Sequence, residues 1–329
     1  MSRVIEHTLV NEAAPVTLHD VLRAARRIRD IVRPTPLERS ASLSVAAGAD
    51  VWLKLETLQR TGSFKLRGAV NAVSLLSPVE RARGLVTASA GNHGLGVALA
   101  ARELGARATV FVPADAPATK RQRIAAFGAT LREVPGGYDD AHAEAEAYAA
   151  DHGALYLHAF SDPAVVAGQG TVALEIFDAL PEARTLVVPV GGGGLVGGVG
   201  TVARAVGGVR VVGVQSKATS AMHASLAAGR LVSPPLEPTL CEGLAGDVDA
   251  PSLSLAQRVL DEIVLVPEEA VRSAMRRLYR EEGVVVEGSG AVAAAALWEG
   301  ALPNLESPVV VVLSGSNVDA TLLAQIVQD

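Results

Sequence analysis

The sequence contains little cysteine, few aromatic residues and no concentrated basic segment. Its 329 residues include a single cysteine, Cys241, which excludes an internal disulfide and fits a reducing compartment. Phe, Tyr and Trp make up 3% of the chain, so the core has to be built from aliphatic residues. The formal net charge is -6, and without a basic block neither nucleic acid nor an anionic membrane is an expected partner.

Segments that direct a chain to a membrane are also lacking. The N-terminus is mixed polar and has no apolar signal-peptide region. The long apolar stretches carry glycines and alternate with polar helices, which is not typical of membrane spans. We therefore expect a cytoplasmic protein that acts on a small molecule, with the first fifteen or so residues as a loose arm.

The pattern of strands and helices predicts an α/β fold. Valine-rich runs at residues 186–190 and 309–313 are typical of strands buried on both faces of a parallel sheet. Short strands alternate with helices between residues 84 and 153, which predicts a small α/β domain inserted into a large domain of residues 1–83 and 154–329. Each domain is expected to be an open, twisted, mostly parallel sheet flanked by helices. Residues 216–254 are loop-rich, and no order of elements is predicted for them.

Lys65 lies in a segment whose spacing predicts the start of a helix. Residues 61–69 read TGSFKLRGA, and apolar residues recur at helical spacing from Phe64 onward, so a helix is expected to begin near Ser63. The positive end of the helix and the apolar neighbours Phe64 and Leu66 would both lower the pKa of the amine. A partly neutral lysine suits Schiff-base chemistry. For a lysine considered alone, the usual explanation is a solvated residue at a helix start.

Three buried strands are each followed by small or polar residues and then a helix. In open α/β sheets ligands bind at these carboxyl ends, because helix N-termini offer free N–H groups and a positive dipole end. At one junction residues 191–194 are four glycines, whose amides can approach a phosphate without hindrance from Cβ atoms. The alternative is a tight turn with close helix packing. The GxGxxG pattern also occurs here, but the next strand ends at Gln215 instead of the acid that binds the ribose of NAD.

The other two junctions carry hydroxyl and amide side chains. Ser89 and Asn92 can donate hydrogen bonds to a carboxylate at a helix start, or one of them can cap that helix. His93 beside them is as readily explained by a structural role. At the third junction Ser314 can face a ligand, while Ser316 or Asn317 is expected to cap the terminal helix.

Taken together in collinear order, these segments resemble the fold-type II (tryptophan-synthase β-like) family of pyridoxal-phosphate enzymes, in its serine/threonine dehydratase branch. The resemblance spans nearly the whole chain and implies pyridoxal 5'-phosphate as cofactor. The matching segments are residues 62–69, 89–93, 168–171, 189–195, 287–291 and 314–317.

The resemblance also implies a role for each candidate residue. Lys65 would carry the cofactor as a Schiff base, Phe64 would pack on its ring, Asn92 would bond its 3-hydroxyl oxygen and Ser314 would meet its pyridine nitrogen. The phosphate would be held by the backbone amides of Gly191, Gly192, Gly193, Gly194 and Leu195. The substrate carboxylate would be received by Ser89, Ala90, Gly91, Asn92 and His93.

The implied reaction removes the β-hydroxyl of L-threonine, L-serine or a related β-hydroxy amino acid to give a 2-oxo acid and ammonia, with Lys65 as the base at Cα. Serine racemases carry a second basic serine where this chain has Ala90, so elimination is expected over racemisation. Gln215 stands where racemase relatives have a metal-binding glutamate, so no metal is expected. Glu242 stands where relatives commonly have aspartate, so the sequence does not decide which amino acid is the substrate. A regulatory domain that binds isoleucine is not encoded, so no inhibition by isoleucine is expected.

Two alternatives to this function remain at the level of sequence. The chain could be a racemase or a β-replacement synthase of the same fold. It could also be a non-catalytic protein that binds phosphate or a nucleotide through the four glycines. A homo-oligomer, most simply a dimer, is expected in each case, and the substrate side chain, monovalent-cation activation and residual racemase activity are not predicted.

Overall fold

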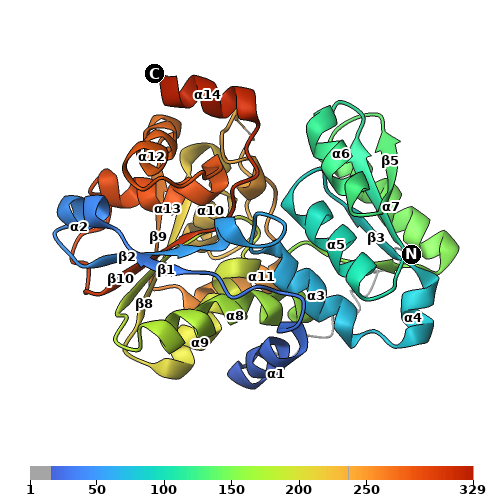
Figure 1. Cartoon of the computed structure of the whole chain (residues 1–329), viewed down its shortest axis with the longest axis horizontal. Coiled ribbons are helices and arrows are strands. Elements are labelled where there is room, and N and C mark those ends of the chain that lie inside the picture. Colours follow the sequence, from blue (N-terminus) through green and yellow to red (C-terminus); the bar gives the residue numbers. More distant parts are fainter. Residues whose placement is uncertain (1–15, 236, 329) are drawn as a thin grey trace, which may run out of the picture.

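The computed structural model describes residues 16–235 and 237–328 and contains two sheets (Figure 1). The N-terminal arm expected from the sequence lies outside the described residues. The predicted α/β class with mostly parallel sheets is confirmed. No described helix has the length and apolar character needed to cross a membrane.

The larger sheet has six strands in the order β1-β2-β10-β7-β8-β9. All neighbours pair in parallel except β1 and β2, which are antiparallel at one edge. The short edge strand β1 was not predicted because three residues carry too little pattern to indicate a strand. The strands are β1 (Leu37–Arg39), β2 (Val51–Leu55), β7 (Thr185–Pro189), β8 (Arg210–Ser216), β9 (Glu262–Val266) and β10 (Val309–Leu313).

Both faces of this sheet are covered by helices, as the valine-rich strands predicted. In β10, Val309 and Val311 pack into one apolar cluster, and Val310 and Val312 pack into another on the opposite face. Figure 1 shows these two layers of helices above and below the sheet. One layer holds α2 (Ala41–Ala47), α12 (Glu268–Glu281), α13 (Gly288–Trp298) and α14 (Ala320–Gln328); the other holds α1 (Leu18–Ile28), α8 (Pro163–Ala179), α9 (Gly194–Val206) and α11 (Ala250–Val259).

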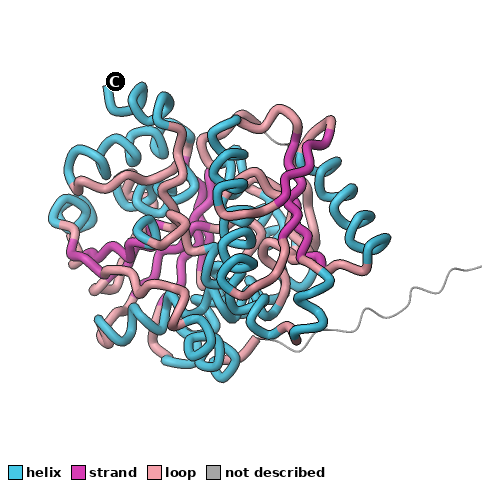
Figure 2. Tube along the Cα trace, turned by 45° about the vertical axis from the view of Figure 1, so that its right-hand side comes forward, coloured by secondary structure: helices cyan, strands magenta, loops and turns pink. Residues whose placement is uncertain are grey.

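The smaller sheet is parallel throughout, with strand order β5-β4-β3-β6. Its strands are β3 (Leu85–Ala88), β4 (Ala108–Pro113), β5 (Thr130–Val134) and β6 (Leu155–Tyr156). Its helices are α5 (Asn92–Glu103), α6 (Ala118–Ala126) and α7 (Tyr138–His152). Figure 2 shows the strands of both sheets lying between helices. Strand β6 lies just past residue 153, and the domain boundary itself stays a prediction.

Helix α3 (Lys65–Leu75) lies between the helices of the larger sheet and those of the smaller sheet, since it packs against α8 on one side and α5 on the other. The short α4 (Pro78–Arg83) then leads into β3. Helix α8 begins at Pro163, and the Asp162 side chain caps it by accepting a hydrogen bond from the Ala164 amide. The loop-rich residues 216–254 contain α10 (Ala221–Ala228), the start of α11 and two short 3-10 helices.

Candidate active site

Lys65 is the first residue of α3, and the chain before it is fixed to the end of β10. The Phe64 amide donates to the carbonyl of Ser314 at 3.1 Å, and Ser63 pairs with Gly315 in an antiparallel bridge. Gly62 has a φ of 73°, and a Cβ there would lie 2.6 Å from the Asn317 side chain. The two segments therefore meet only because residue 62 is glycine.

The Lys65 amine is in an environment that favours its neutral form. Its Nζ donates to the carbonyl of Ala159 at 2.9 Å and lies 5.3 Å from the centre of the Phe64 ring. Desolvation lowers the pKa of Lys65 to about 8, and the Glu287 carboxylate opposes that shift. The lowered pKa expected from the sequence is thus confirmed, with burial as its cause. Roughly a quarter of the amine is neutral at pH 7.5, against about one part in a thousand for an ordinary lysine.

The four glycines at residues 191–194, which we call the glycine turn, connect β7 to α9 and have other residues packed against them on both sides. A Cβ on Gly192 would lie 2.5 Å from the Phe160 ring, and one on Gly194 would lie 2.7 Å from the Phe160 carbonyl. A Cβ on Gly191 would lie 3.0 Å from Cα of Leu244. The packing expected of a tight turn is therefore present. The first amides of α9 have no partner within the helix, so the turn also offers donors to an anion.

Asn92 is held by two side chains from the other end of the sequence. Its Nδ2 donates to Glu287 Oε1 at 2.6 Å, and its Oδ1 accepts from Nδ2 of Asn317. It does not cap α5, which begins after Gly91 without a side-chain cap bond. The Ser89 hydroxyl accepts from the Gly91 amide at 3.1 Å, before the helix begins. Both side chains are therefore available to shape a ligand turn.

The expected cap of the terminal helix is wrong. Neither Ser316 nor Asn317 caps α14; the Asp319 carboxylate accepts from the Thr321 amide at 2.8 Å instead. Ser316 donates to the Thr57 carbonyl at 3.0 Å, and Asn317 donates to the carbonyl of Thr61 as well as to Asn92. The site takes these two side chains because the loop after β10 turns toward the start of α3.

His93 is buried and uncharged. Its Nε2 donates to the Leu157 carbonyl at 3.1 Å, and burial lowers its pKa to about 3. Within the described part of the chain its Nδ1 has no hydrogen-bond partner. The structural role weighed for this residue is therefore supported.

Ser314 lies buried at the end of β10, in contact with the start of α13. Its hydroxyl donates to the Ser289 carbonyl at 3.4 Å, and the Ser289 hydroxyl accepts from the Gly243 amide at 2.8 Å. These contacts are all between neutral groups. A ligand nitrogen beside Ser314 would therefore meet a hydroxyl and not a carboxylate.

Sequence reasoning assigned no role to two features of the site. Glu287 lies beside Asn92, a Cβ on Gly315 would be 2.3 Å from its Oε1, and burial raises its pKa to about 7. The signal was present: an acid directly before the Gly-Ser-Gly-Ala start of a buried helix. The other feature is the segment of Ala159 and Phe160, which contacts both Lys65 and the glycine turn and carries no motif.

The profile of the pyridoxal-phosphate dependent enzymes matches residues 28–315. The chain belongs to this family. It is 41% identical over 317 residues to an L-threonine ammonia-lyase of Thermotoga maritima, covering 95% of this chain and 78% of that protein. It is 40% identical over 322 residues to a putative threonine dehydratase of Sinorhizobium fredii, covering 97% of each chain. The structure of maize serine racemase superposes with a TM-score of 0.91 at 30% identity, covering 94% of this chain and 96% of that one.

The residues present fit pyridoxal phosphate. The glycine turn forms a cradle that a Cβ would fill, and its free amides suit a phosphate. Three further groups lie where the start of α3 meets the loop after β10. They are the Lys65 amine of lowered pKa, the neutral hydroxyl of Ser314 and the oriented amide of Asn92. The predicted family, fold class and cofactor are confirmed by the match. The role of each residue stays a prediction.

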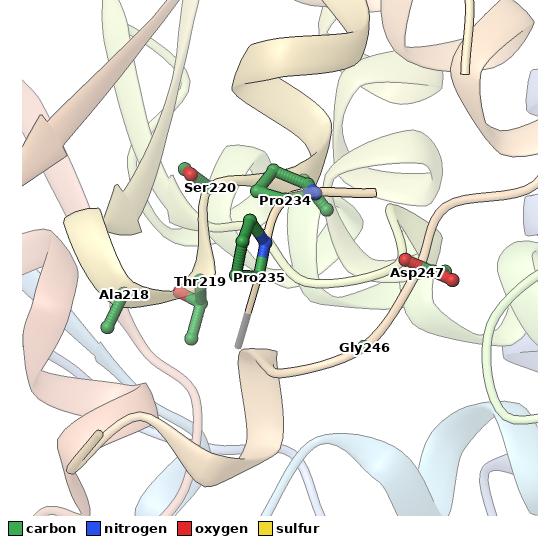
Figure 3. Close-up of a pocket in the computed structure, with 8 residues that line it drawn as sticks. Ala218, Thr219, Ser220, Pro234, Pro235, Gly246 and Asp247 are labelled. Atoms are coloured by element: carbon green, nitrogen blue, oxygen red, sulfur yellow. The ribbon is translucent and has the colours of Figure 1, made fainter. Parts of the chain in front are cut away.

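The expected absence of a metal concerns the end of β8. The buried Gln215 presents its Oε1 to the His223 amide at 2.8 Å, so an amide occupies the position at which an acid would bind a metal. The residues that come after β8 line a pocket together with two later segments of the chain (Figure 3). Its lining consists of residues 218–221, 234–235 and 246–247, and Asp247 is the one acid among them. In the described ranges no three His, Cys, Asp or Glu side chains group as metal ligands. Metal independence stays a prediction.

Proposed function

We propose that the protein is an ammonia-lyase that removes the β-hydroxyl of L-threonine, L-serine or a related β-hydroxy amino acid, giving a 2-oxo acid and ammonia. The observation that carries this proposal is the Lys65 amine of lowered pKa, which donates to the Ala159 carbonyl, while the preceding Phe64 amide is bonded to Ser314. Identity of about 40% to proteins named threonine ammonia-lyase or dehydratase, over nearly the whole chain, supports it.

The roles of the cofactor-binding residues follow from their chemistry. Amides of residues 191–195 would hold the phosphate, Phe64 would pack on the ring, Asn92 would donate to the 3-oxygen and Ser314 would face the ring nitrogen. When bound, pyridoxal phosphate supplies the electron-withdrawing group that acidifies the substrate Cα–H. Ser314, being neutral, does not hold a positive charge at the ring nitrogen. That limits stabilisation of the electron pair at Cα and favours expulsion of the β-hydroxyl.

The remaining residues bind the substrate and move its proton. The turn of residues 89–93 lies at the start of α5 and offers its N–H groups to the substrate carboxylate. That contact directs the Cα–H toward Lys65, whose Nζ takes the proton as general base. Desolvation makes the neutral amine available at working pH.

Ala90 favours this reaction over racemisation. Inverting a Cα centre requires a second acid-base group on the opposite face of the ring, and the methyl group of Ala90 cannot carry a proton. The likeness to serine racemase is a likeness of fold, and fold alone does not assign a reaction. We expect D-amino acid formation to be far slower than elimination.

A panel of β-hydroxy amino acids in both enantiomers tests the proposal. Purified holoenzyme should release 2-oxo acid from an L-β-hydroxy amino acid, measured by reduction with a coupled dehydrogenase. Chiral chromatography of the same reactions should show little D-amino acid, and added thiol should yield no substituted product. A dominant D-amino acid or substituted product would replace the proposal by racemase or synthase activity, and the absence of any turnover would contradict it.

We also infer that the protein is a cytoplasmic homo-oligomer, most simply a dimer. Burial of Cys241, whose pKa is raised by desolvation, supports a thiol that persists in a reducing compartment. Light scattering of the purified protein at several concentrations measures the assembly directly.

A further inference from the structure

An ion pair joins the two sheet-centred halves of the molecule near the candidate site. Lys120 lies in the first turn of α6, beside the smaller sheet, and its Nζ binds Glu242 in the 3-10 helix of Glu242–Leu244, beside the larger sheet. The two side chains are 27% and 69% exposed, and an ion pair this accessible adds little to stability. What matters is where the two charges lie.

Lys120 stands at the same sheet edge as the turn that we assign to the substrate carboxylate. Strands β3 and β4 are parallel neighbours, and the Ser89 amide donates to the Phe111 carbonyl at 3.0 Å. Helices α5 and α6 therefore start at the same carboxyl edge. They also touch, since a Cβ on Gly94 would lie 3.1 Å from Cδ1 of Ile124. Lys120 thus lies at the same edge as the turn that we assign to the substrate carboxylate.

Glu242 approaches this region from the opposite side. The amide of the next residue, Gly243, donates to the Ser289 hydroxyl at 2.8 Å, and Leu244 packs on Gly191 of the glycine turn. Both charges also reach the buried Glu287: Lys120 lowers the pKa of that carboxyl and Glu242 raises it. The ion pair is therefore close enough to act on charges inside the site.

We propose that the Lys120–Glu242 pair is a charge filter for the substrate side chain, with Glu242 neutralising the Lys120 cation that a second substrate carboxylate would otherwise bind. This inference rests on the proposed function and narrows it to substrates with uncharged side chains. A substrate with a distal carboxylate would have to displace Glu242 and would also face its negative charge. Specificity of this kind comes from repelling the wrong ligand as much as from binding the right one.

Neutralising Glu242 should allow a ligand with a second carboxylate to bind more tightly. Glu242→Gln keeps the length of the side chain and leaves the charge of Lys120 available to a ligand. One unit charge about 6 Å away, in a partly solvated site with an effective dielectric constant of about 40, changes an equilibrium by roughly tenfold.

Ligands without a leaving group test this in the holoenzyme without depending on turnover. L-2-Aminobutyrate and L-aspartate lack a β-hydroxyl, and their dissociation constants can be taken from the change in cofactor absorbance. Glu242→Gln should tighten L-aspartate about tenfold and change L-2-aminobutyrate less than about twofold. Adding Lys120→Met to that variant should remove the gain. Glu133→Gln is the matched control, because Glu133 pairs with Arg121, the residue next to Lys120 on α6. It should leave the ratio of the two dissociation constants, L-aspartate over L-2-aminobutyrate, unchanged.

The proposal is overturned if the ratio of the two constants does not move in Glu242→Gln, if it moves equally in Glu133→Gln, or if the gain survives Lys120→Met. Its failure is separable from that of the proposed function. Turnover of L-threonine or L-serine by the unmodified enzyme with no shift in the ratio contradicts the filter alone. A shifted ratio without turnover of any β-hydroxy amino acid supports the filter and contradicts the lyase.

Discussion

Two buried lysines of this chain lie on neighbouring elements, and their surroundings differ. Lys54 on β2 donates to Glu175 Oε2 at 2.6 Å and to the Thr35 carbonyl at 2.6 Å. Lys65 on α3 donates to the Ala159 carbonyl alone among the described residues. Burial lowers the pKa of both amines. The difference is the counter-charge, which is bonded to Lys54 and only nearby for Lys65.

The region around Lys54 is a closed network of opposite charges. Arg67 binds Glu56 and Glu175 with both ends of its guanidinium, so two cations face two carboxylates. Glu175 and Glu56 both oppose the lowering of the Lys54 pKa. The comparison teaches that burial alone does not make a lysine reactive. A buried lysine becomes reactive when no carboxylate is bonded to its amine, and the following predictions test the contrast between Lys54 and Lys65.

The largest expected effect belongs to the lysine without a bonded counter-charge. Lys65→Ala should lower elimination by more than about a thousandfold, because it removes both the nucleophile and the base. Thermal unfolding should change little, since no buried ion pair is broken. Activity above about a tenth of the original, in protein shown to be correctly folded, would contradict the assignment.

Lys54→Met should show the reverse pattern. It leaves Glu175 with one cation fewer in a buried network, and breaking such a pair costs about 3 kcal/mol of unfolding free energy. The activity of each folded molecule should stay within a few-fold, which calorimetry together with an assay well below the transition temperature can check. A specific loss of activity without a loss of stability would mean that Lys54 belongs to the reactive site.

The pH dependence of cofactor capture should reveal the amine of lowered pKa. The rate at which the apoprotein forms its Schiff base should rise nearly tenfold per pH unit below pH 8 and level above it, because only the neutral amine reacts. Stopped-flow absorbance measures this rate. A rate that keeps rising to pH 10 would indicate a lysine with an ordinary pKa.

The smallest effect is expected from Glu287, the carboxylate near Lys65. Glu287→Gln removes a negative charge that favours the protonated amine, so the levelling point of the capture rate should move to lower pH by up to about one unit. The amide can still accept from Asn92, which keeps the contact at that side chain. A shift toward higher pH would contradict the sign of this interaction.

Sequence reasoning predicted the parts of the site that depend on local pattern. The glycine turn needs no side chains, and the valine-rich strands and helix starts are visible in short windows, so residues 191–195 and Lys65 could be placed in advance. It assigned no role to Glu287 or Phe160, because their importance comes from contacts with residues about 195 and 32 positions away. The capping error at Ser316 and Asn317 has the same origin: a local rule was overridden by contacts with distant segments.

The chain has only four lysines, Lys54, Lys65, Lys120 and Lys217, and this makes the central claim directly testable. Borohydride reduction of the yellow holoenzyme, followed by proteolysis and mass spectrometry, locates the lysine that carries the cofactor. We predict the reduced pyridoxyl group on Lys65 alone, with Lys54 unlabelled although burial lowers the pKa of its amine too. A label on Lys54, Lys120 or Lys217, or no label on Lys65, would contradict the account.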